Sequence, residues 1–205
     1  KKQNILSTVG IKVSREEAAS SYEKNIIDSY IINNKGNKLD GDAFDVDLGI
    51  ELRKPADQQL LPVFESIQNG KKLYILPLRG KGLWGPIWGF IALKDDMNTI
   101  SGAVFDHKAE TPGLGAEISL DWFQEPFIGK TIFEGSNLVS INVVKGGAPV
   151  DDIHSVDGIS GGTITSDGLA DMLSERFEQY LPFFNKKKSQ MKELLSKSEI
   201  VDGSL

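Results

Sequence analysis

The spacing of apolar residues predicts a helix near the start of the chain. Ser14-Arg15-Glu16-Glu17 fits a capping box, in which the side chains of Ser14 and Glu17 each accept the other residue's free backbone N–H. We therefore expect a helix from this point to about Ile32, ended by the Asn- and Gly-rich residues 33–37. Its apolar face would consist of Tyr22, Ile26, Ile27, Tyr30 and Ile31.

Short apolar runs separated by Gly-rich or Asp- and Asn-rich turns fill the middle of the chain. Residues 38–70 are polar and mixed, and they predict a strand over Phe44–Leu52 and a short helix after Pro55. Further strands are predicted at Leu73–Leu78, Ile87–Leu93, Thr99–His107, Thr131–Phe133 and Val139–Val144. Because turns join most successive strands, we expect a largely antiparallel sheet flanked by helices, which is an α+β fold.

A second long helix is predicted near the end of the chain, with Ser166-Asp167-Gly168 as its cap. Its apolar residues recur at helical spacing, at Leu169, Met172, Leu173, Phe177, Tyr180 and Leu181. We expect Pro182 to end it, and the Lys- and Ser-rich tail from Asn185 to be either a short helix or poorly ordered. The predicted organisation is an N-terminal helical and mixed segment (1–70), a domain (71–184) on which it packs, and a polar C-terminal tail (185–205).

Composition narrows the classes of function. The 205 residues include 29 acidic and 23 basic ones, so the net charge is −6. This balance argues against nucleic acid as a partner, because neutralising phosphates requires clustered Lys and Arg. Cysteine is absent, which excludes disulfides and thiolate chemistry. We expect His107 and His154 to be structural, and we expect no metal site.

Membrane and targeting signals are also absent from the sequence. No apolar run approaches the ~18 residues that a spanning helix needs, and no signal peptide is recognisable. The chain begins with Lys and not Met, so we expect that a segment precedes it in the full-length protein.

Two familiar motifs occur in contexts that do not suit them. Gly80-Lys81-Gly82-Leu83-Trp84-Gly85 matches the dinucleotide pattern G-x-G-x-x-G, but Pro86 and the apolar residues after it predict a strand where that pattern needs a helix. Gly158-Ile159-Ser160-Gly161-Gly162 matches the nucleophile elbow G-x-S-x-G. A serine hydrolase of that kind needs a histidine after the serine, and both histidines precede Ser160. This reading is therefore disfavoured.

The second motif has another interpretation. Residues 157–165 are small and polar, and they run directly into the start of the last long helix. Small residues let backbone N–H groups approach a phosphate, and a helix N-terminus favours an anion. Thr163 and Thr165 add hydroxyl groups there. The pattern is that of a phosphate-binding loop, or of a plain turn followed by a helix cap.

These residues resemble a known family. Asp157-Gly158-Ile159-Ser160-Gly161-Gly162-Thr163 resembles the flavinylation motif of the FMN-binding domain family, with Gly162 where that family usually has Ala. The resemblance extends in order to the C subunits of sodium-translocating NADH:quinone reductases. It is carried by Asn4-Ile5-Leu6, Gly82-Leu83-Trp84, His107-Lys108-Ala109-Glu110-Thr111-Pro112-Gly113-Leu114-Gly115 and the closing helix. The nearest related alternative is the G subunit of the Rnf electron-transport complex.

The resemblance implies a role for each matched residue. Thr163 would accept FMN through a phosphoester, made by a flavin transferase that uses FAD and Mg²⁺. FMN would be absent from protein made without that enzyme. Around the phosphate, the resemblance implies Asp157 as the leading acid of the motif, a cradle of Ser160, Gly161 and Gly162, Thr165 as a hydrogen-bond donor and Lys145 as a nearby positive charge. Around the flavin ring, it implies a loop with Glu110, Thr111, Gly113 and Leu114, and a stacking turn with Leu83 and Trp84.

The resemblance also implies a setting. The chain would be an electron-transfer subunit without catalytic activity of its own, working with the other subunits of an ion-translocating reductase. It would be held by one N-terminal transmembrane helix missing from this chain, with its domain on the extracytoplasmic side of the bacterial inner membrane. Two alternatives stay open, a binding module that is never flavinylated and the disfavoured hydrolase.

Overall fold

A six-stranded antiparallel sheet in the order β2-β1-β3-β4-β5-β6 forms the centre of the computed structural model, which describes residues 1–202. The strands are β1 (Ile26–Ile32), β2 (Lys38–Leu39), β3 (Leu61–Gln68), β4 (Lys71–Lys81), β5 (Pro86–Lys94) and β6 (Ile100–His107). The predicted α+β class and the largely antiparallel sheet are confirmed. Residues 1–70 supply β1, β2 and β3, so the two segments that we predicted on either side of residue 70 share this sheet.

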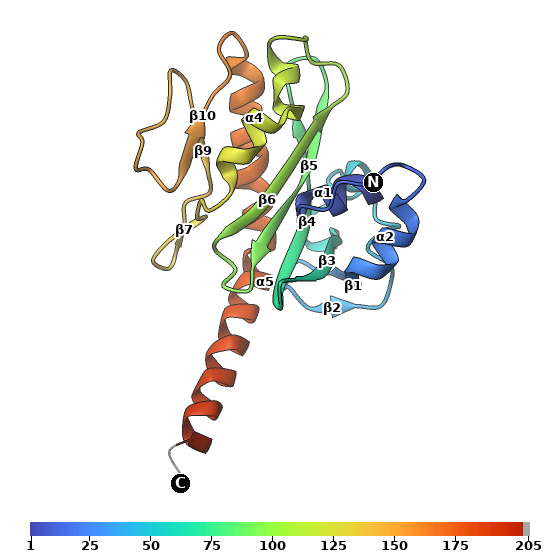
Figure 1. Ribbon diagram of the computed structural model, residues 1–205, viewed down its shortest axis with the longest axis vertical. Coiled ribbons are helices and arrows are strands. Elements are labelled where there is room, and N and C mark those ends of the chain that lie inside the picture. Colours follow the sequence, from blue (N-terminus) through green and yellow to red (C-terminus); the bar gives the residue numbers. More distant parts are fainter. Residues whose placement is uncertain (203–205) are drawn as a thin grey trace.

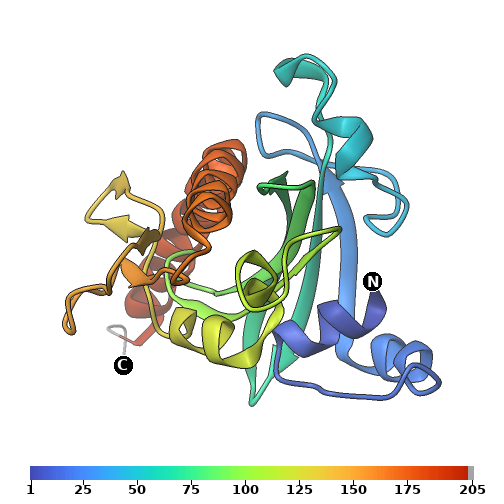
Figure 2. The ribbon, with the colours of Figure 1, turned by 90° about the horizontal axis from the view of Figure 1, so that it is seen from above.

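Helices cover both faces of the sheet (Figures 1 and 2). α1 (Lys2–Thr8) and α2 (Ala18–Asn25) lie on one face, and the long α5 (Thr163–Asp202) lies on the other. The remaining elements are α3 (Leu48–Glu51), η1 (Ala56–Gln58), η2 (Gly115–Ser119), α4 (Asp121–Gln124), η3 (Glu125–Phe127), β7 (Phe133–Glu134), β8 (Asn137–Leu138), β9 (Asn142–Val144) and β10 (Ser155–Asp157).

Alternation along β4 separates two apolar cores. Tyr74, Leu76 and Leu78 belong to the large core on the side of α5, whereas Ile75 belongs to a smaller core with Ile5 of α1. This follows from the strand geometry, in which successive side chains point to opposite faces. The central strands are therefore buried on both faces, which explains why they read as apolar runs in the sequence.

The apolar face of α5 packs on the sheet as its spacing predicts. Phe177, Tyr180 and Phe184 are fully buried, and the Tyr180 hydroxyl donates a hydrogen bond of 2.8 Å to the Pro62 carbonyl. The helix begins at Thr163, three residues before the expected cap. This start places the loop of residues 157–162 directly at its N-terminus.

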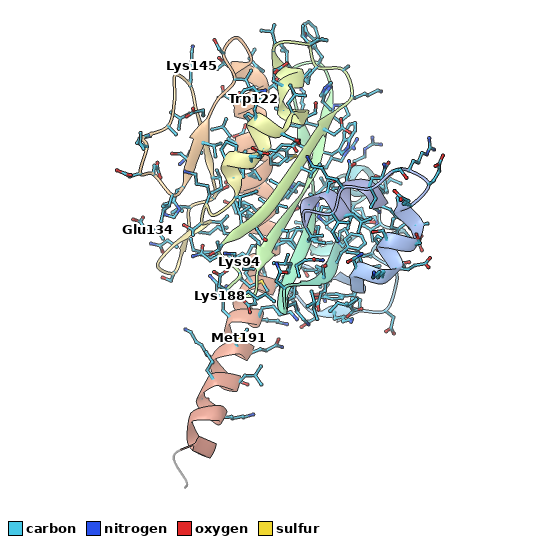
Figure 3. All side chains as sticks on the ribbon, viewed as in Figure 1. Lys94, Trp122, Glu134, Lys145, Lys188 and Met191 are labelled. Carbon is cyan, nitrogen blue, oxygen red and sulfur yellow. The ribbon has the colours of Figure 1, made fainter. Side chains whose placement is uncertain are left out.

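The expected end of α5 at Pro182 is wrong, because Pro182 lies inside the helix. The buried Phe183 and Phe184 directly after it hold the chain in place and offset the hydrogen bond that proline removes. The helix continues to Asp202 and leaves the body of the molecule as an arm (Figure 1), on which Met191 is labelled in Figure 3. Residues 203–205 of the predicted tail lie outside the described residues.

The predicted first helix is correct only near its beginning. Its capping box is present, since the Glu17 carboxylate accepts the Ser14 amide at 3.1 Å and the Ser14 hydroxyl accepts the Glu17 amide at 3.3 Å. The helix ends at Asn25, and residues 26–32 form β1. These residues are rich in Ile and include Tyr30, and both residue types suit strands. Pairing with β3 and β2 decides their conformation.

Two other local predictions are corrected. The expected strand over Phe44–Leu52 is a loop followed by α3, whose first turn is capped by the Asp47 carboxylate accepting the Gly49 amide at 2.7 Å. The pair expected at Thr131–Phe133 and Val139–Val144 is replaced by β7 with β8, while β9 pairs in parallel with β10. The strands predicted around β4, β5 and β6 and the short helix after Pro55 are confirmed. α1 and β3 were not predicted.

All four tyrosines of the chain should resist ionisation while the protein is folded. Burial raises the pKa of Tyr22 and Tyr74 to about 12, and it raises the pKa of Tyr30 and Tyr180 as well. A tyrosine in the unfolded chain titrates near about 10. The stability that depends on these neutral phenols is therefore complete below a pH of about 10 and is lost as the pH rises toward about 12 and beyond.

An ultraviolet titration of tyrosinate absorbance tests this prediction against the same titration in denaturant. We expect little tyrosinate in the native protein until circular dichroism reports unfolding. Ionisation near the denatured value with the fold intact would contradict the burial of these side chains.

Candidate functional site

The loop that connects β10 to α5 borders an open cavity of about 370 Å³. β9 and β10 run in parallel, so the turn after β9 and the loop after β10 meet at one end of this pair. The cavity is lined by Lys145, Gly146, Gly147, Asp157, Gly158, Ile159, Ser160, Gly161 and Thr163. The structure thus brings Lys145 to the predicted phosphate loop, although the sequence separates them by many residues.

Thr163 is the first residue of α5 and lines this cavity. Its side chain is half-buried, and none of the described residues makes a hydrogen bond to its hydroxyl. The first amides of a helix have no partner within the helix, and the positive end of the helix dipole lies there. The Thr163 hydroxyl therefore stands beside free backbone donors, where an anionic group is favoured.

Ser166 fixes the loop to the helix. Its hydroxyl accepts a hydrogen bond of 3.1 Å from the Ile159 amide, and its own amide donates to the Gly162 carbonyl at 2.9 Å. Ser166 is buried, so these contacts are protected from water. The loop geometry at Thr163 is therefore set by the helix itself.

Two glycines of the loop leave room that a side chain would fill. Gly161 has a φ of +75°, and a Cβ there would lie 2.7 Å from Cδ2 of Leu114. A Cβ on Gly162 would lie 2.9 Å from Cγ2 of Ile159 and 3.3 Å from the Gly115 amide nitrogen. An alanine at position 162, which the resemblance implies as the usual residue, would thus require a small shift in this chain.

Glu110 connects three parts of the site. Glu110 is 5% exposed. One carboxylate oxygen accepts the Trp84 amide at 2.9 Å, and the other accepts the Thr165 hydroxyl at 2.5 Å. The Thr165 proton is therefore directed to Glu110, which differs from the expected bond to a phosphate. Gly82 and Gly115 border this carboxylate so closely that a Cβ on either would lie 2.6 Å from one of its oxygens.

Exposed apolar side chains occur on the turn, the loop and the helix start that meet at Glu110. Leu83 is 43% exposed, Trp84 65%, Leu114 39% and Ile164 58%. Thr111 and Gly113 are also exposed, in the loop that carries Leu114. Such a group of residues suits a flat, partly apolar ligand or a partner surface. Ile164 was not among the predicted site residues, although its position directly after Thr163 was a signal for it.

Two charged residues of the prediction, Asp157 and Lys145, line the cavity itself. The Asp157 carboxylate accepts the Ala148 amide at 2.7 Å and so holds the turn after β9. Lys145 is exposed on that turn (Figure 3), and none of the ion pairs among residues 1–197 includes it. Its ammonium group is therefore available to an anion in the cavity.

The two familiar motifs have structural roles. Residues 82–85 form the turn between β4 and β5, as predicted, and no helix follows that turn. Ser160 is exposed, and neither histidine reaches it: Nδ1 of His107 accepts the Glu110 amide at 3.1 Å, and Nδ1 of His154 lies 2.6 Å from the Thr131 carbonyl oxygen. In the part of the chain that the structure describes, no group of His, Asp and Glu is placed to hold a metal ion.

Comparison with known proteins supports a flavin-related site. Residues 82–177 match the FMN-binding domain family, and this range contains the turn of Trp84, the Glu110 loop and Thr163. The C subunit of the Na(+)-translocating NADH-quinone reductase of Vibrio anguillarum is 33% identical over 189 residues, which cover 82% of this chain and 72% of that protein. The corresponding protein of Vibrio vulnificus is 44% identical over 105 residues.

Two solved structures share the fold. The crystal structure of the C subunit of the Na(+)-translocating NADH-quinone reductase from Parabacteroides distasonis superposes with a TM-score of 0.84 at 43% identity, covering 89% of this chain and 90% of that one. The structure of NqrC from Shewanella oneidensis gives a TM-score of 0.81 at 28% identity, covering 92% and 96%.

The match covers less than half the length of some relatives. It spans 41% of the Vibrio vulnificus protein and 45% of the corresponding protein from Neisseria meningitidis. None of the helices formed by residues 1–202 combines the length and the apolar character that a bilayer crossing requires.

Proposed function

Because the chain belongs to the family of C subunits of Na(+)-translocating NADH-quinone reductases, we propose that it carries FMN through a phosphoester to Thr163 and transfers electrons within such a complex. The observation that carries this proposal is the position of Thr163. Thr163 is half-buried, its hydroxyl has no hydrogen-bond partner among the described residues, and it stands at the N-terminus of α5, at the edge of a glycine-lined cavity.

The cavity's chemistry fits the phosphate of FMN. The free amides at the start of α5 would donate to the phosphate oxygens, and the left-handed Gly161 keeps the loop backbone close. Lys145 would add a positive charge from the turn after β9. Asp157 would act indirectly, by holding that turn through the Ala148 amide.

The exposed apolar residues fit the flavin ring. Leu83 and Trp84 on one turn and Leu114 on the next loop would contact the ring. Thr111 would hydrogen-bond to its polar edge, and Gly113 has a φ of +75° that shapes the loop. When bound, FMN supplies the redox chemistry, while these residues orient the ring and exclude water from part of it.

The attachment is a group transfer. The Thr163 oxygen would form a bond to the FMN phosphorus of FAD, the P–O bond to AMP would break, and AMP would leave with the electron pair of that bond. The proton of the threonine hydroxyl would pass to a base of the modifying enzyme or to solvent. No histidine or lysine contacts the Thr163 hydroxyl among the described residues, so the site lacks a base of its own. This supports modification by a separate flavin transferase with FAD and Mg²⁺.

The family also supports a membrane setting. We propose that the chain works with the other subunits of a sodium-translocating reductase, on the extracytoplasmic side of a bacterial inner membrane, and that an N-terminal helix outside residues 1–205 anchors it. A covalent cofactor suits such a carrier, because its occupancy does not depend on the free concentration of FMN or on changes of affinity between redox states.

Expression of the chain with and without a bacterial flavin transferase tests the proposal. We expect visible flavin absorbance that survives denaturation and desalting only in the protein made with the transferase, and reversible bleaching of that absorbance by dithionite. Failure to retain flavin, with the transferase active on a control substrate, would favour the unflavinylated binding module.

A further inference from the structure

Glu110 has a buried carboxylate that forms no ion pair with the side chains of residues 1–197. The residue is 5% exposed. Burying a carboxylate is costly unless hydrogen bonds compensate it. The Trp84 amide and the Thr165 hydroxyl provide that compensation, so the fold is organised to keep this group in place.

The surroundings of Glu110 do not neutralise its charge. The Nδ1 atom of His107 accepts the Glu110 amide at 3.1 Å, so this nitrogen offers no proton. Gly82 and Gly115 border the carboxylate directly and bring no charge. A negative charge in such a setting acts over a longer distance than one at the surface, because water screens it less.

Glu110 lies between the two parts of the proposed flavin site. One carboxylate oxygen contacts the turn that carries Leu83 and Trp84, and the other contacts Thr165, two residues after Thr163 in α5. The carboxylate thus joins the turn proposed to contact the ring to the helix that carries the residue proposed to hold its phosphate.

We propose that Glu110 is a positioning residue that also sets the reduction potential of the flavin: it joins the Trp84 turn to α5, and its negative charge opposes the addition of electrons to FMN held on Thr163. This inference rests on the proposed function. Reduction brings negative charge to the flavin, and a nearby fixed negative charge makes that step less favourable. Glu110 would therefore hold the midpoint potential lower than a neutral residue would.

Two substitutions separate the charge from the contacts. Glu110→Gln is nearly the same shape; its oxygen can still accept the Trp84 amide and its NH₂ group can donate to the Thr165 hydroxyl oxygen, but the charge is gone. Glu110→Asp keeps the charge on a shorter side chain, which cannot reach both partners. Glu117→Gln is the matched control, because Glu117 lies in the same segment and its carboxylate accepts the Trp122 indole N–H at 3.0 Å near the surface.

The experiment is a spectroelectrochemical titration of the flavin-loaded full chain and the three variants, with thermal unfolding measured in parallel. We expect a more positive midpoint potential for Glu110→Gln than for the wild type, and potentials close to the wild type for Glu110→Asp and Glu117→Gln. We expect reduced thermal stability for Glu110→Asp.

The inference is overturned if Glu110→Gln carries FMN at the wild-type potential, or if Glu110→Asp alone shifts it, since the contacts and not the charge would then decide the potential. Absence of FMN from the wild type itself would be a failure of the proposed function, seen before any variant is compared. If Glu110→Gln does not fold, a wild-type potential in Glu110→Asp despite lost stability supports the inference, and a shifted one overturns it.

Discussion

Replacing Thr163 by alanine should abolish covalent flavin on this chain, whereas Thr163→Ser should retain it. Alanine removes the hydroxyl that would form the phosphoester, and serine keeps that oxygen at the first position of α5. The side chain makes no hydrogen bond within the described residues, so neither variant should unfold the protein. Intact mass after treatment with a flavin transferase, FAD and Mg²⁺ measures the result as a gain of one FMN less one water.

Ser160→Ala is the matched control for this prediction. Ser160 lines the same cavity and is exposed, so its loss tests whether any hydroxyl of the loop can be modified. We expect full modification of Ser160→Ala. A mass gain in Thr163→Ala, or its absence in Ser160→Ala alone, would move the attachment site away from Thr163.

Replacing Gly168 by alanine should lower the free energy of unfolding by about 1–3 kcal/mol, as overpacking does in well-packed proteins. Alanine normally stabilises a helix interior by about 1 kcal/mol relative to glycine. A loss of stability would therefore show that a steric contact outweighs this helix preference. In this helix, a Cβ on Gly168 would lie 2.2 Å from the Lys81 carbonyl oxygen, which is a backbone atom at the end of β4. The helix or the strand must therefore move.

Urea denaturation of Gly168→Ala and Gly85→Ala measures this effect. A Cβ on Gly85 would be 3.7 Å from Cβ of Lys108, an ordinary contact, so we expect Gly85→Ala to remain close to the wild type. Because the displaced helix carries Thr163, Gly168→Ala should also be flavinylated more slowly. Wild-type stability in Gly168→Ala would show that α5 does not approach β4 as closely as described.

The central hairpins of the sheet were predictable from the sequence because neighbouring residues determine both their strands and their turns. β4, β5 and β6 are apolar runs joined by short turns, and each strand pairs with the next one along the chain. Turn residues and strand composition therefore suffice to locate them. β1 was predicted as helix because its apolar residues also match helical spacing, and its strand conformation depends on β3, which lies more distant in sequence.

The candidate site also has one part that was predictable from local sequence and one part that was not. The loop of residues 157–163 was recognisable because the motif and the helix that follows it are contiguous. The contact between Glu110 and Thr165 joins residues that are 55 positions apart, and no spacing rule relates a loop after β6 to the first turn of α5. Because this contact was not visible in the sequence, we predicted that Thr165 donates a hydrogen bond to a phosphate, whereas in the structure its hydroxyl donates to Glu110.

The close packing of backbone at three glycines explains how the fold positions the site. Gly168 lets α5 approach the end of β4, Gly115 leaves space for the Thr165 hydroxyl, and Gly82 leaves space for the Glu110 carboxylate. Together these contacts hold the N-terminus of α5 against the turn of Trp84. The proposed phosphate and ring positions are thus fixed relative to each other by the protein before any cofactor is attached.

Fragmentation mass spectrometry of the flavin-loaded wild-type chain tests the central claim most directly. Trypsin should release residues 146–176 as one peptide, since Lys145 and Arg176 flank a stretch without Lys or Arg. This peptide contains both Thr163 and the alternative hydroxyls of Ser160 and Thr165. We predict that the fragment ions place FMN on Thr163; FMN on another residue, or an unmodified peptide from protein exposed to an active transferase, would contradict the account.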